Sequence, residues 1–349
     1  MRLIGSQDRG AAVGTGVASA LTAAIIDSAG SEPRLGSITL PPRRPGTTVL
    51  SVFAAALNPL DLVIASGTFH SARHEAPYVP GSECVGVVVE SDRYAAGTWM
   101  YAETHASPSD PGSFATHVLV PDTSLAPLPN GVDPIQAVAV GNSGTAAYMP
   151  LVEYAGLRGD ETVLILGATG AVGQLAVQIA HRRGAGRVVG VARDRSALKR
   201  LSALGADAVV ALRDDEDSET LAGRISEVAG PVHVVLDGLY GVPLEAALHS
   251  CAPRARIVNI GNPAGAVVRI PAGLLRGKQL TLAGFAGLHT PLQDKLEALT
   301  WLWNALLRNE LHVDVRTYPL SQIQTAWKLQ ASSSHGKCVI LPDERGCVA

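Results

Sequence analysis

The chain has 349 residues, of which 47% are hydrophobic and 17% charged, and its net charge is −3. This length exceeds what one hydrophobic core usually holds, so the chain should form two domains. The nearly balanced charge argues against a nucleic-acid partner or a charged membrane surface. The cysteines form no C-x-x-C pair, which favours a cytoplasmic protein with neither a disulfide framework nor a zinc ribbon; they are Cys84, Cys251, Cys338 and Cys347.

The amino-terminal segment from Ala11 to Ile26 carries no charge and resembles a signal peptide in outline, because Arg2 and Arg9 precede it. Glycine and hydroxyl residues keep it only weakly apolar, and it has no leucine-rich centre. It is also too short and too polar to span a membrane. We therefore expect residues 1–20 to form an extension that leads into a first strand at Thr22–Asp27.

Short apolar runs broken by proline and glycine continue as far as Asp122 and predict an irregular, β-rich domain. The expected strands are Thr47–Ala54, Val85–Glu90, Thr98–Ala102 and Ser113–Val120. Near the other end of the chain, a long helical pattern at Pro291–Asn309 precedes a last strand at Gly336–Pro342. We expect that strand to return to the β-rich domain.

From Asp160 to about Ala286, apolar runs alternate with helical patterns, which predicts a parallel sheet covered by helices on both faces. The expected strands are Thr162–Leu166, Arg187–Ala192, Ala208–Ala211, His233–Leu236, Arg256–Ile260 and Gln279–Phe285. The expected helices are Gln174–Arg183, Arg195–Leu204, Ser218–Val228 and Leu244–Cys251. We assign residues 126–287 to this Rossmann-type, nucleotide-binding domain, and residues 1–125 and 288–349 to the β-rich domain.

A glycine-rich turn separates the first of these strands from the first helix, and it reads Ala168-Thr169-Gly170-Ala171-Val172-Gly173. Strand, glycine turn and helix in this order form the usual site for a nucleotide pyrophosphate. Gly170 would let the backbone approach the phosphates, and Gly173 would let the helix pack close to the strand. The helix N-terminus offers free N–H groups and a partial positive charge. Ala168 replaces the first glycine of the usual motif, so the turn alone also fits a plain helix cap.

The residues after the second strand indicate which cofactor binds. Enzymes that use NAD place Asp or Glu at this point to bind the ribose 2′-hydroxyl. Here Arg193 stands there, followed by Asp194, Arg195 and, one helical turn later, Lys199. A guanidinium pairs well with a 2′-phosphate, so the sequence favours NADPH. The alternative is a solvated basic helix start, with Asp194 as its cap.

Several motifs then occur in one order along the chain. They are Asn58-Pro59-Leu60-Asp61, Pro80-Gly81-Ser82-Glu83-Cys84-Val85-Gly86, Gly112-Ser113-Phe114-Ala115, Gly144-Thr145-Ala146-Ala147-Tyr148, the glycine turn, and His335-Gly336-Lys337-Cys338-Val339-Ile340. Together they resemble the medium-chain dehydrogenase/reductase superfamily, and within it the zinc-free quinone oxidoreductase branch that includes zeta-crystallin. The resemblance covers roughly residues 22–342. It implies an α/β fold in which a Rossmann domain interrupts a GroES-like catalytic domain.

Two departures from the family pattern concern the substrate pocket rather than the fold. The segment before the second part of the β domain is shortened to Ala96-Gly97-Thr98-Trp99-Met100, and Thr145 stands where leucine is frequent.

The resemblance also bears on metal binding. The positions that hold zinc ligands in other branches carry Asn58, Ser82 and, approximately, Asn142, while Glu83 keeps an acidic position. One carboxylate does not make a tetrahedral zinc site, so we expect no metal ion. Cys84 follows Glu83 on a strand and should be a buried structural cysteine. Without a Lewis acid, alcohol oxidation is disfavoured, whereas quinones and α,β-unsaturated carbonyls can still accept hydride.

By resemblance, Asn58 faces the nicotinamide and the substrate, although it also fits a simple Asn-Pro turn. Thr145 would bind the phosphate or ribose on the nicotinamide side, or it would only cap a helix. Lys337 would reach the cofactor phosphates or lie on the surface. The ends of the last two Rossmann strands would line the nicotinamide, largely through backbone groups; these residues are Asn259, Gly261, Phe285 and Ala286.

The leading hypothesis is therefore an NADPH-dependent reductase of quinones or α,β-unsaturated carbonyls that uses no metal ion. A second is a reductase dedicated to one double bond in a biosynthetic pathway, and a third is a non-catalytic NADPH-binding protein with a structural or regulatory role. By analogy with the family, we expect a homodimer that pairs through the strand at Gln279–Phe285.

Overall fold

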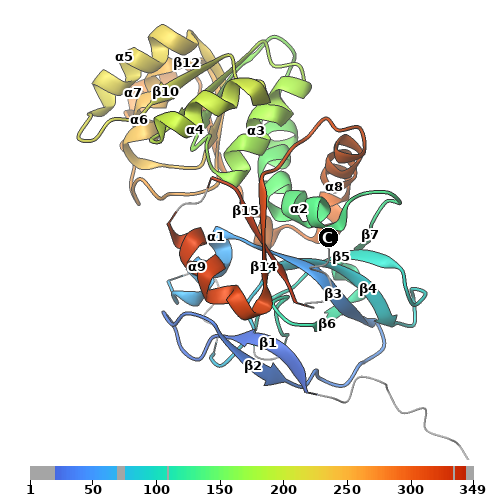
Figure 1. Cartoon of the computed structure of the whole chain (residues 1–349). Coiled ribbons are helices and arrows are strands. Elements are labelled where there is room, and N and C mark those ends of the chain that lie inside the picture. Colours follow the sequence, from blue (N-terminus) through green and yellow to red (C-terminus); the bar gives the residue numbers. More distant parts are fainter. Residues whose placement is uncertain (1–19, 69–74, 108–109, 333–334, 343–349) are drawn as a thin grey trace, which may run out of the picture.

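The computed structural model describes residues 20–68, 75–107, 110–332 and 335–342, so the expected extension at residues 1–20 lies almost wholly outside the described residues. Figure 1 shows two parts, a β-rich part and a part in which helices cover a parallel sheet. Helix α2 (Pro134–Met149) and strand β15 (Lys337–Leu341) lie where the two parts meet. The expected α/β fold, with a GroES-like and a Rossmann-like part, is confirmed.

The β-rich part contains a seven-stranded sheet in the order β14-β15-β3-β4-β5-β7, with β6 paired to β3. The strands are β3 (Thr47–Leu57), β4 (Glu83–Glu90), β5 (Trp99–Glu103), β6 (His117–Pro121), β7 (Leu125–Pro127), β14 (Val315–Pro319) and β15. A separate hairpin pairs β1 (Leu21–Ile25) with β2 (Arg34–Ile38). Helices α1 (Pro59–Ala65) and α9 (Ile323–Ala331) belong to the same part. Because β15 pairs antiparallel with β3, the chain returns to this sheet as predicted.

The other sheet has six strands, all parallel, in the order β10-β9-β8-β11-β12-β13. In chain order this is 3-2-1-4-5-6, the order typical of a dinucleotide-binding sheet. The strands are β8 (Thr162–Leu166), β9 (Arg187–Ala192), β10 (Ala208–Ala211), β11 (Val232–Asp237), β12 (Cys251–Asn259) and β13 (Thr281–Gly284). Its helices are α3 (Ala171–Arg182), α4 (Arg195–Arg200), α5 (Ser218–Ala229), α6 (Gly241–Ser250) and α7 (Ala272–Gly277). The bounds of β8, β9 and β10 agree with the prediction.

The four predicted helices differ from the structure at their ends; α3, for example, begins at Ala171 rather than at Gln174. The helix expected at Arg195–Leu204 is α4 followed by a 3₁₀ turn, because the chain tightens before Gly205, whose φ is +105°. The helix expected at Leu244–Cys251 is α6, and Cys251 instead begins β12 in an extended conformation.

Two long helices form the junction between the parts. Helix α8 (Leu292–Leu307) lies within the long helical pattern and packs against α2. The sequence analysis predicted no helix at the position of α2. Trp303 of α8 lies edge to face with Tyr101 of β5, with ring centroids 5.8 Å apart. The same hydrophobic cluster contains residues of both sheets, such as Val85 and Ile165. This shared core fixes how the two parts face each other.

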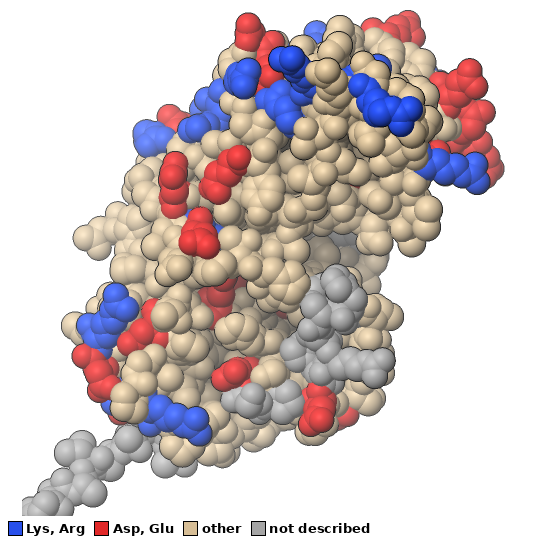
Figure 2. Space-filling model, turned by 180° about the vertical axis from the view of Figure 1, so that it is seen from behind, with Lys and Arg blue, Asp and Glu red and all other residues tan. Residues whose placement is uncertain are grey.

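Among the described residues, no helix is long and apolar enough to cross a membrane. Seen from behind, the surface is hollowed between the upper and lower parts, and Lys and Arg side chains gather mainly on the upper, parallel-sheet part (Figure 2). The carboxyl ends of the parallel strands, such as Leu166 of β8, Asp237 of β11 and Asn259 of β12, lie together at one edge of this sheet. In open α/β sheets, this edge is where ligands bind.

Candidate active site

The glycine turn lies between β8 and α3, as predicted. A Cβ on Gly173 would collide with the Gly167 carbonyl oxygen and lie 2.6 Å from the Ala168 Cα, so helix and turn pack too closely for any side chain there. A Cβ on Gly170 would meet nothing nearer than the Gly167 carbonyl oxygen, at 3.6 Å. The glycine at position 170 is therefore not required by packing, and it leaves open space at the start of α3.

That space is suited to an anion. Gly170 is the N-cap of α3 and supplies no side chain to its first N–H groups. Those groups belong to Ala171, Val172 and Gly173. Thr169 is largely buried, and its carbonyl oxygen accepts a hydrogen bond from Gln174 Nε2 at 2.8 Å. A side chain of α3 therefore fixes the turn. The free N–H groups and the dipole of α3 can bind a pyrophosphate there.

Arg193 directly follows β9, the second strand of this sheet in chain order, and its side chain is exposed. Arg195 and Lys199 are exposed on α4, and none of the three forms an ion pair with a described residue. Asp194 is the N-cap of α4, and its Oδ1 accepts hydrogen bonds from the backbone of Ser196 at 2.8 Å and of Ala197 at 3.0 Å. The cap that the sequence offered as an alternative is thus present, and it leaves the three basic side chains available.

The paired ends of β12 and β13 lie at the same edge of the parallel sheet as the turn. Asn259 Nδ2 donates to Asp237 Oδ2 at 2.7 Å and to the Gly261 carbonyl at 2.8 Å. Phe285 is buried and its backbone N–H donates to the Asn259 carbonyl, whereas Ala286 is exposed. The fold brings the four residues predicted here to one edge of the sheet; they are Asn259, Gly261, Phe285 and Ala286. Asp237, a buried acid at the end of β11 whose pKa burial raises, shapes this edge and was missed by the sequence analysis.

The positions that hold metal ligands in other branches of the resembled superfamily also converge, and Lys337 lies among them. Its Nζ donates to Asn58 Oδ1, and to Ser143 Oγ at 2.8 Å, and it lies 3.7 Å from Glu83 Oε1. Asn58 Nδ2 donates to Glu83 Oε1 at 2.8 Å and to Ser82 Oγ at 3.1 Å. We call these five residues the lysine cluster. All are buried, and burial lowers the pKa of Lys337, while the nearby acids oppose that shift.

Glu83 fixes the cluster to helix α2. Its second oxygen, Oε2, accepts hydrogen bonds from the backbone of Asn142 at 2.7 Å and from the Tyr101 hydroxyl at 2.9 Å. A Cβ on Gly141 would collide with that oxygen and lie 2.6 Å from Tyr101 Cε2. The glycine of α2 is therefore the space into which the carboxylate fits, a signal that the sequence analysis did not use.

The contacts of Asn58 determine which way its amide points. The oxygen must face the ammonium of Lys337, and the nitrogen must face the Glu83 carboxylate, since the reverse would oppose like groups. Asn58 is thus turned into the cluster and largely buried, rather than presented to the space outside. Thr145 is also buried, inside α2, and its hydroxyl donates to the Asn142 carbonyl at 3.0 Å, so it does not cap a helix end.

Asp61 stands beside the cluster at the start of α1. Its Oδ2 accepts the Asn58 backbone N–H at 2.7 Å, so it supports the Asn-Pro turn. Complete burial raises the pKa of Asp61 to about 7. Cys84, next to Glu83, is buried as a free thiol, as predicted, and burial also raises its pKa.

Two family models match the chain. A model described as an alcohol dehydrogenase GroES-like domain matches residues 44–130, and one described as a zinc-binding dehydrogenase matches residues 171–304. The matched ranges fall in the β-rich part and the parallel-sheet part, respectively.

Known proteins resemble the chain at moderate identity. Human quinone oxidoreductase is 27% identical over 225 residues, which are 64% of this chain and 67% of the human protein. One polypeptide of the phenolphthiocerol/phthiocerol polyketide synthase of Mycobacterium tuberculosis is 30% identical over 313 residues, 85% of this chain but only 14% of that polypeptide. The structure of Escherichia coli quinone oxidoreductase complexed with NADPH superimposes with a TM-score of 0.79 at 24% identity, covering 92% of this chain and all of that chain. At that identity the superposition supports the fold.

Proposed function

Because the chain belongs to the medium-chain dehydrogenase/reductase superfamily, in its quinone oxidoreductase branch, we propose that it reduces a quinone or an α,β-unsaturated carbonyl with NADPH and without a catalytic metal ion. The observation that carries this proposal is the lysine cluster, in which a buried ammonium stands among the positions that hold a metal ion elsewhere in the superfamily.

The residues around the glycine turn fit NADPH. The open space at Gly170 and the free N–H groups of α3 would receive the pyrophosphate, and Arg193, Arg195 and Lys199 would receive the 2′-phosphate. The edge at Asn259 and Phe285 would receive the nicotinamide ring. When bound, the reduced nicotinamide supplies the hydride.

The residues of the lysine cluster do not fit a zinc ion. Asn58 and Ser82 are weak ligands for zinc, and an ammonium group a hydrogen bond away would repel a dication. Glu83, the only carboxylate in the cluster, already has four hydrogen-bond or ionic partners. Among the described residues, no group of three or more His, Cys, Asp or Glu side chains could hold a metal ion. The cluster therefore does not fit the metal that the second family model describes.

Lys337 and Ser143 would assist the reaction by polarising the acceptor. Ser143 Oγ accepts from Lys337 Nζ, so its own proton is left to donate, and no acceptor for that proton lies among the described residues. A hydroxyl held in this way beside a buried cation can stabilise negative charge that develops on a carbonyl oxygen. Quinones and enones delocalise that charge and need only such modest help.

The test uses the full chain with NADPH and a panel of quinones and enones, with NADPH consumption as the readout and the metal content of the same sample measured. Turnover by protein that contains no stoichiometric metal supports the proposal. The variant R193A should weaken NADPH binding much more than NADH binding, with R213A as a matched control in an exposed loop. Tight NADPH binding without turnover across the panel would instead favour the non-catalytic hypothesis, and zinc-dependent turnover would refute the metal-free one.

A second candidate function is a reductase dedicated to one biosynthetic double bond. It is favoured by the similarity of 85% of this chain to part of a polyketide synthase. Such an enzyme would reduce a particular enone and ignore simple quinones in the same panel.

We also propose that the protein is a homodimer. Strand β13 lies at the edge of the parallel sheet, and Leu282 on it is exposed. An unpaired edge of this kind favours pairing with a second copy. A monomeric mass in light scattering would contradict this.

A further inference from the structure

The short segment from His335 to Lys337 connects the two ends of the proposed cofactor site. Lys337 points into the lysine cluster, while the side chain of His335 reaches the end of β9 and contacts Asp194. Gln174 of α3 donates to the carbonyl oxygens of both His335 and Thr169. A piece of the β-rich part is therefore held against the nucleotide turn of the other part.

At the end of β9, both oxygens of the Asp194 carboxylate are occupied. Oδ1 accepts from the Ser196 backbone and hydroxyl, at 2.8 and 2.7 Å, and from the Ala197 backbone. Oδ2 accepts from His335 Nε2 at 2.8 Å. These hydrogen bonds hold the pKa of Asp194 well below its ordinary value, so the carboxylate is charged.

A charged carboxylate at this place has a strong effect on cofactor choice. With one oxygen free, it would accept a hydrogen bond from a ribose 2′-hydroxyl and would repel a 2′-phosphate. The capping bonds need only Oδ1, so Oδ2 is the oxygen that could take this role. His335 is the one described residue that contacts Oδ2. The basic side chains of Arg193, Arg195 and Lys199 remain the open partners for an anion.

We propose that His335 determines cofactor specificity: by donating to Asp194 Oδ2 it blocks recognition of the ribose hydroxyl of NADH and leaves the site selective for NADPH. The inference rests on the proposed use of NADPH. His335 acts through Asp194 and is a positioning residue. The specificity of the parallel-sheet part is thus controlled by a residue that the returning chain supplies, about 140 positions further along the sequence.

The test measures dissociation constants of NADPH and NADH for the full chain by fluorescence titration. The variant H335A should lower the preference for NADPH by about fivefold, the size expected for one partly exposed charge contact. H335Q, whose amide can donate to the same oxygen, should keep most of the preference. In a D194S background, where serine still caps α4 and no carboxylate remains, H335A should leave the preference unchanged. Equal unfolding midpoints would show that each variant is folded.

Different outcomes separate this inference from the proposed function. A preference for NADPH that depends on Arg193 but not on His335 would overturn the inference alone. A loss of preference in H335A that persists in the D194S background would also overturn it, because His335 would then act on the cofactor directly. A wild-type chain that binds NADH as tightly as NADPH, with no effect of R193A, would overturn the proposed cofactor as well.

Discussion

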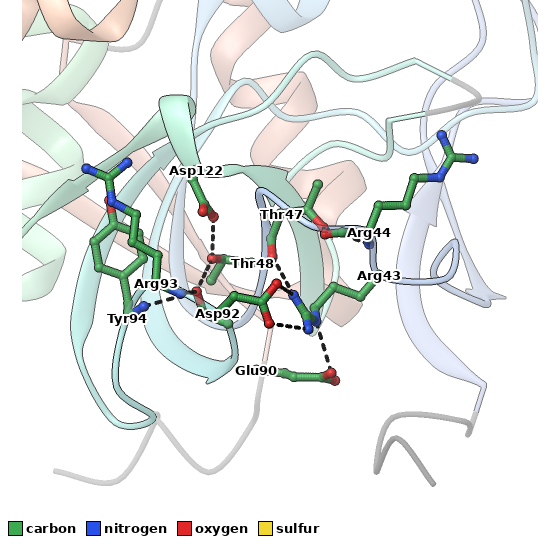
Figure 3. A network of polar contacts seen from close by, with 10 residues as sticks. Arg43, Arg44, Thr47, Thr48, Glu90, Asp92, Arg93, Tyr94 and Asp122 are labelled. Carbon is green, nitrogen blue, oxygen red and sulfur yellow. Dashed lines mark hydrogen bonds and ion pairs between the residues drawn. The ribbon is translucent and has the colours of Figure 1, made fainter. Parts of the chain in front are cut away.

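Two polar clusters in the β-rich part have similar bonds and opposite surroundings. The arginine cluster consists of Arg43, Glu90 and Asp92, in which Arg43 forms ion pairs with Asp92 at 2.7 Å and with Glu90 at 2.9 Å (Figure 3). Beside it, the Thr48 hydroxyl lies 2.7 Å from the Ser91 hydroxyl. In the lysine cluster, Lys337 contacts Glu83, Asn58 and Ser143. The Asp92 side chain is 56% exposed, whereas those of Lys337 and Glu83 are 2% and 1% exposed.

The comparison shows that hydrogen-bond distances alone do not indicate how much a charged contact contributes to stability. Water solvates the partners of Arg43 whether or not they pair, so pairing changes little. The charges of the lysine cluster have lost their water, and each depends on the others to offset that loss. A buried cluster of this cost is retained where it has a task, and the proposed task is to provide a fixed cation at the reacting centre.

The largest expected effect comes from removing the buried cation. In K337M, the buried Glu83 loses the ammonium as its partner, and breaking a buried pair in this way typically costs about 3–5 kcal/mol. We expect a lower midpoint in urea unfolding and loss of reductase activity. R43M, in the arginine cluster, should shift the midpoint much less.

A companion variant separates charge from packing. E83Q removes the unpaired charge, so the double variant K337M/E83Q should recover part of the stability lost in K337M. If the double variant is as unstable as the sum of the two single variants, the two charges are not coupled and the comparison between the clusters fails.

A smaller effect is expected from filling the space that the Glu83 carboxylate uses. In G141A, the new Cβ would collide with Glu83 Oε2 and with Tyr101, which should cost about 1–3 kcal/mol of unfolding free energy. The control is G223A in α5, where a Cβ would meet nothing within 4 Å and alanine should stabilise the helix by about 0.5–1 kcal/mol. Equal effects of both substitutions would show that Gly141 has no special role.

Asp61, which lies beside the lysine cluster, should give stability a pH dependence. Burial raises its pKa from 3.8 to about 7. As the pH rises from about 4 to about 7, the unfolded chain loses this proton first, so the contribution of Asp61 to stability falls, by at most about 1.4 kcal/mol per pH unit. D61N can still accept the Asn58 N–H and lacks this proton. Urea unfolding should therefore show D61N gaining on the wild type up to about pH 7 and then a constant difference; a constant difference throughout would contradict the prediction.

The same contrast explains what the sequence could predict. Strands β8 and β9 are short apolar runs that are almost wholly buried, whereas β10 is an apolar run at the edge of the sheet, with Val209 exposed. Their bounds could be predicted because each is a short continuous apolar run between polar residues or glycine. Helix α2 was not predicted, because small and apolar residues occupy all of its own faces. Its sequence therefore shows no amphipathic period. The glycine turn and Arg193 were found because their chemistry lies within a few neighbouring residues.

The lysine cluster could not be predicted in this way. Its members come from the turn between β3 and α1, from the start of β4, from α2 and from β15, and Asn58 and Lys337 are 279 positions apart. A lysine is rarely buried, so its sequence neighbours favoured either a surface position or a contact with phosphate. The burial of Lys337 results from the return of β15 to the sheet, and only the three-dimensional fold brings its partners together.

The smallest effect on stability is expected in the arginine cluster, which is the more exposed of the two. In D92N, Arg43 loses one charged partner but keeps Glu90 and the Thr47 carbonyl, and water replaces the lost contact. Arg43 holds the pKa of Asp92 below its ordinary value, so at neutral pH only the charge is removed. Urea unfolding at low salt should show a shift near the limit of measurement, and at about 1 M salt none, because ions screen charges beyond about 3 Å. A shift as large as that of K337M, unchanged by salt, would mean that exposure does not separate the two clusters and that burial gives Lys337 no special role.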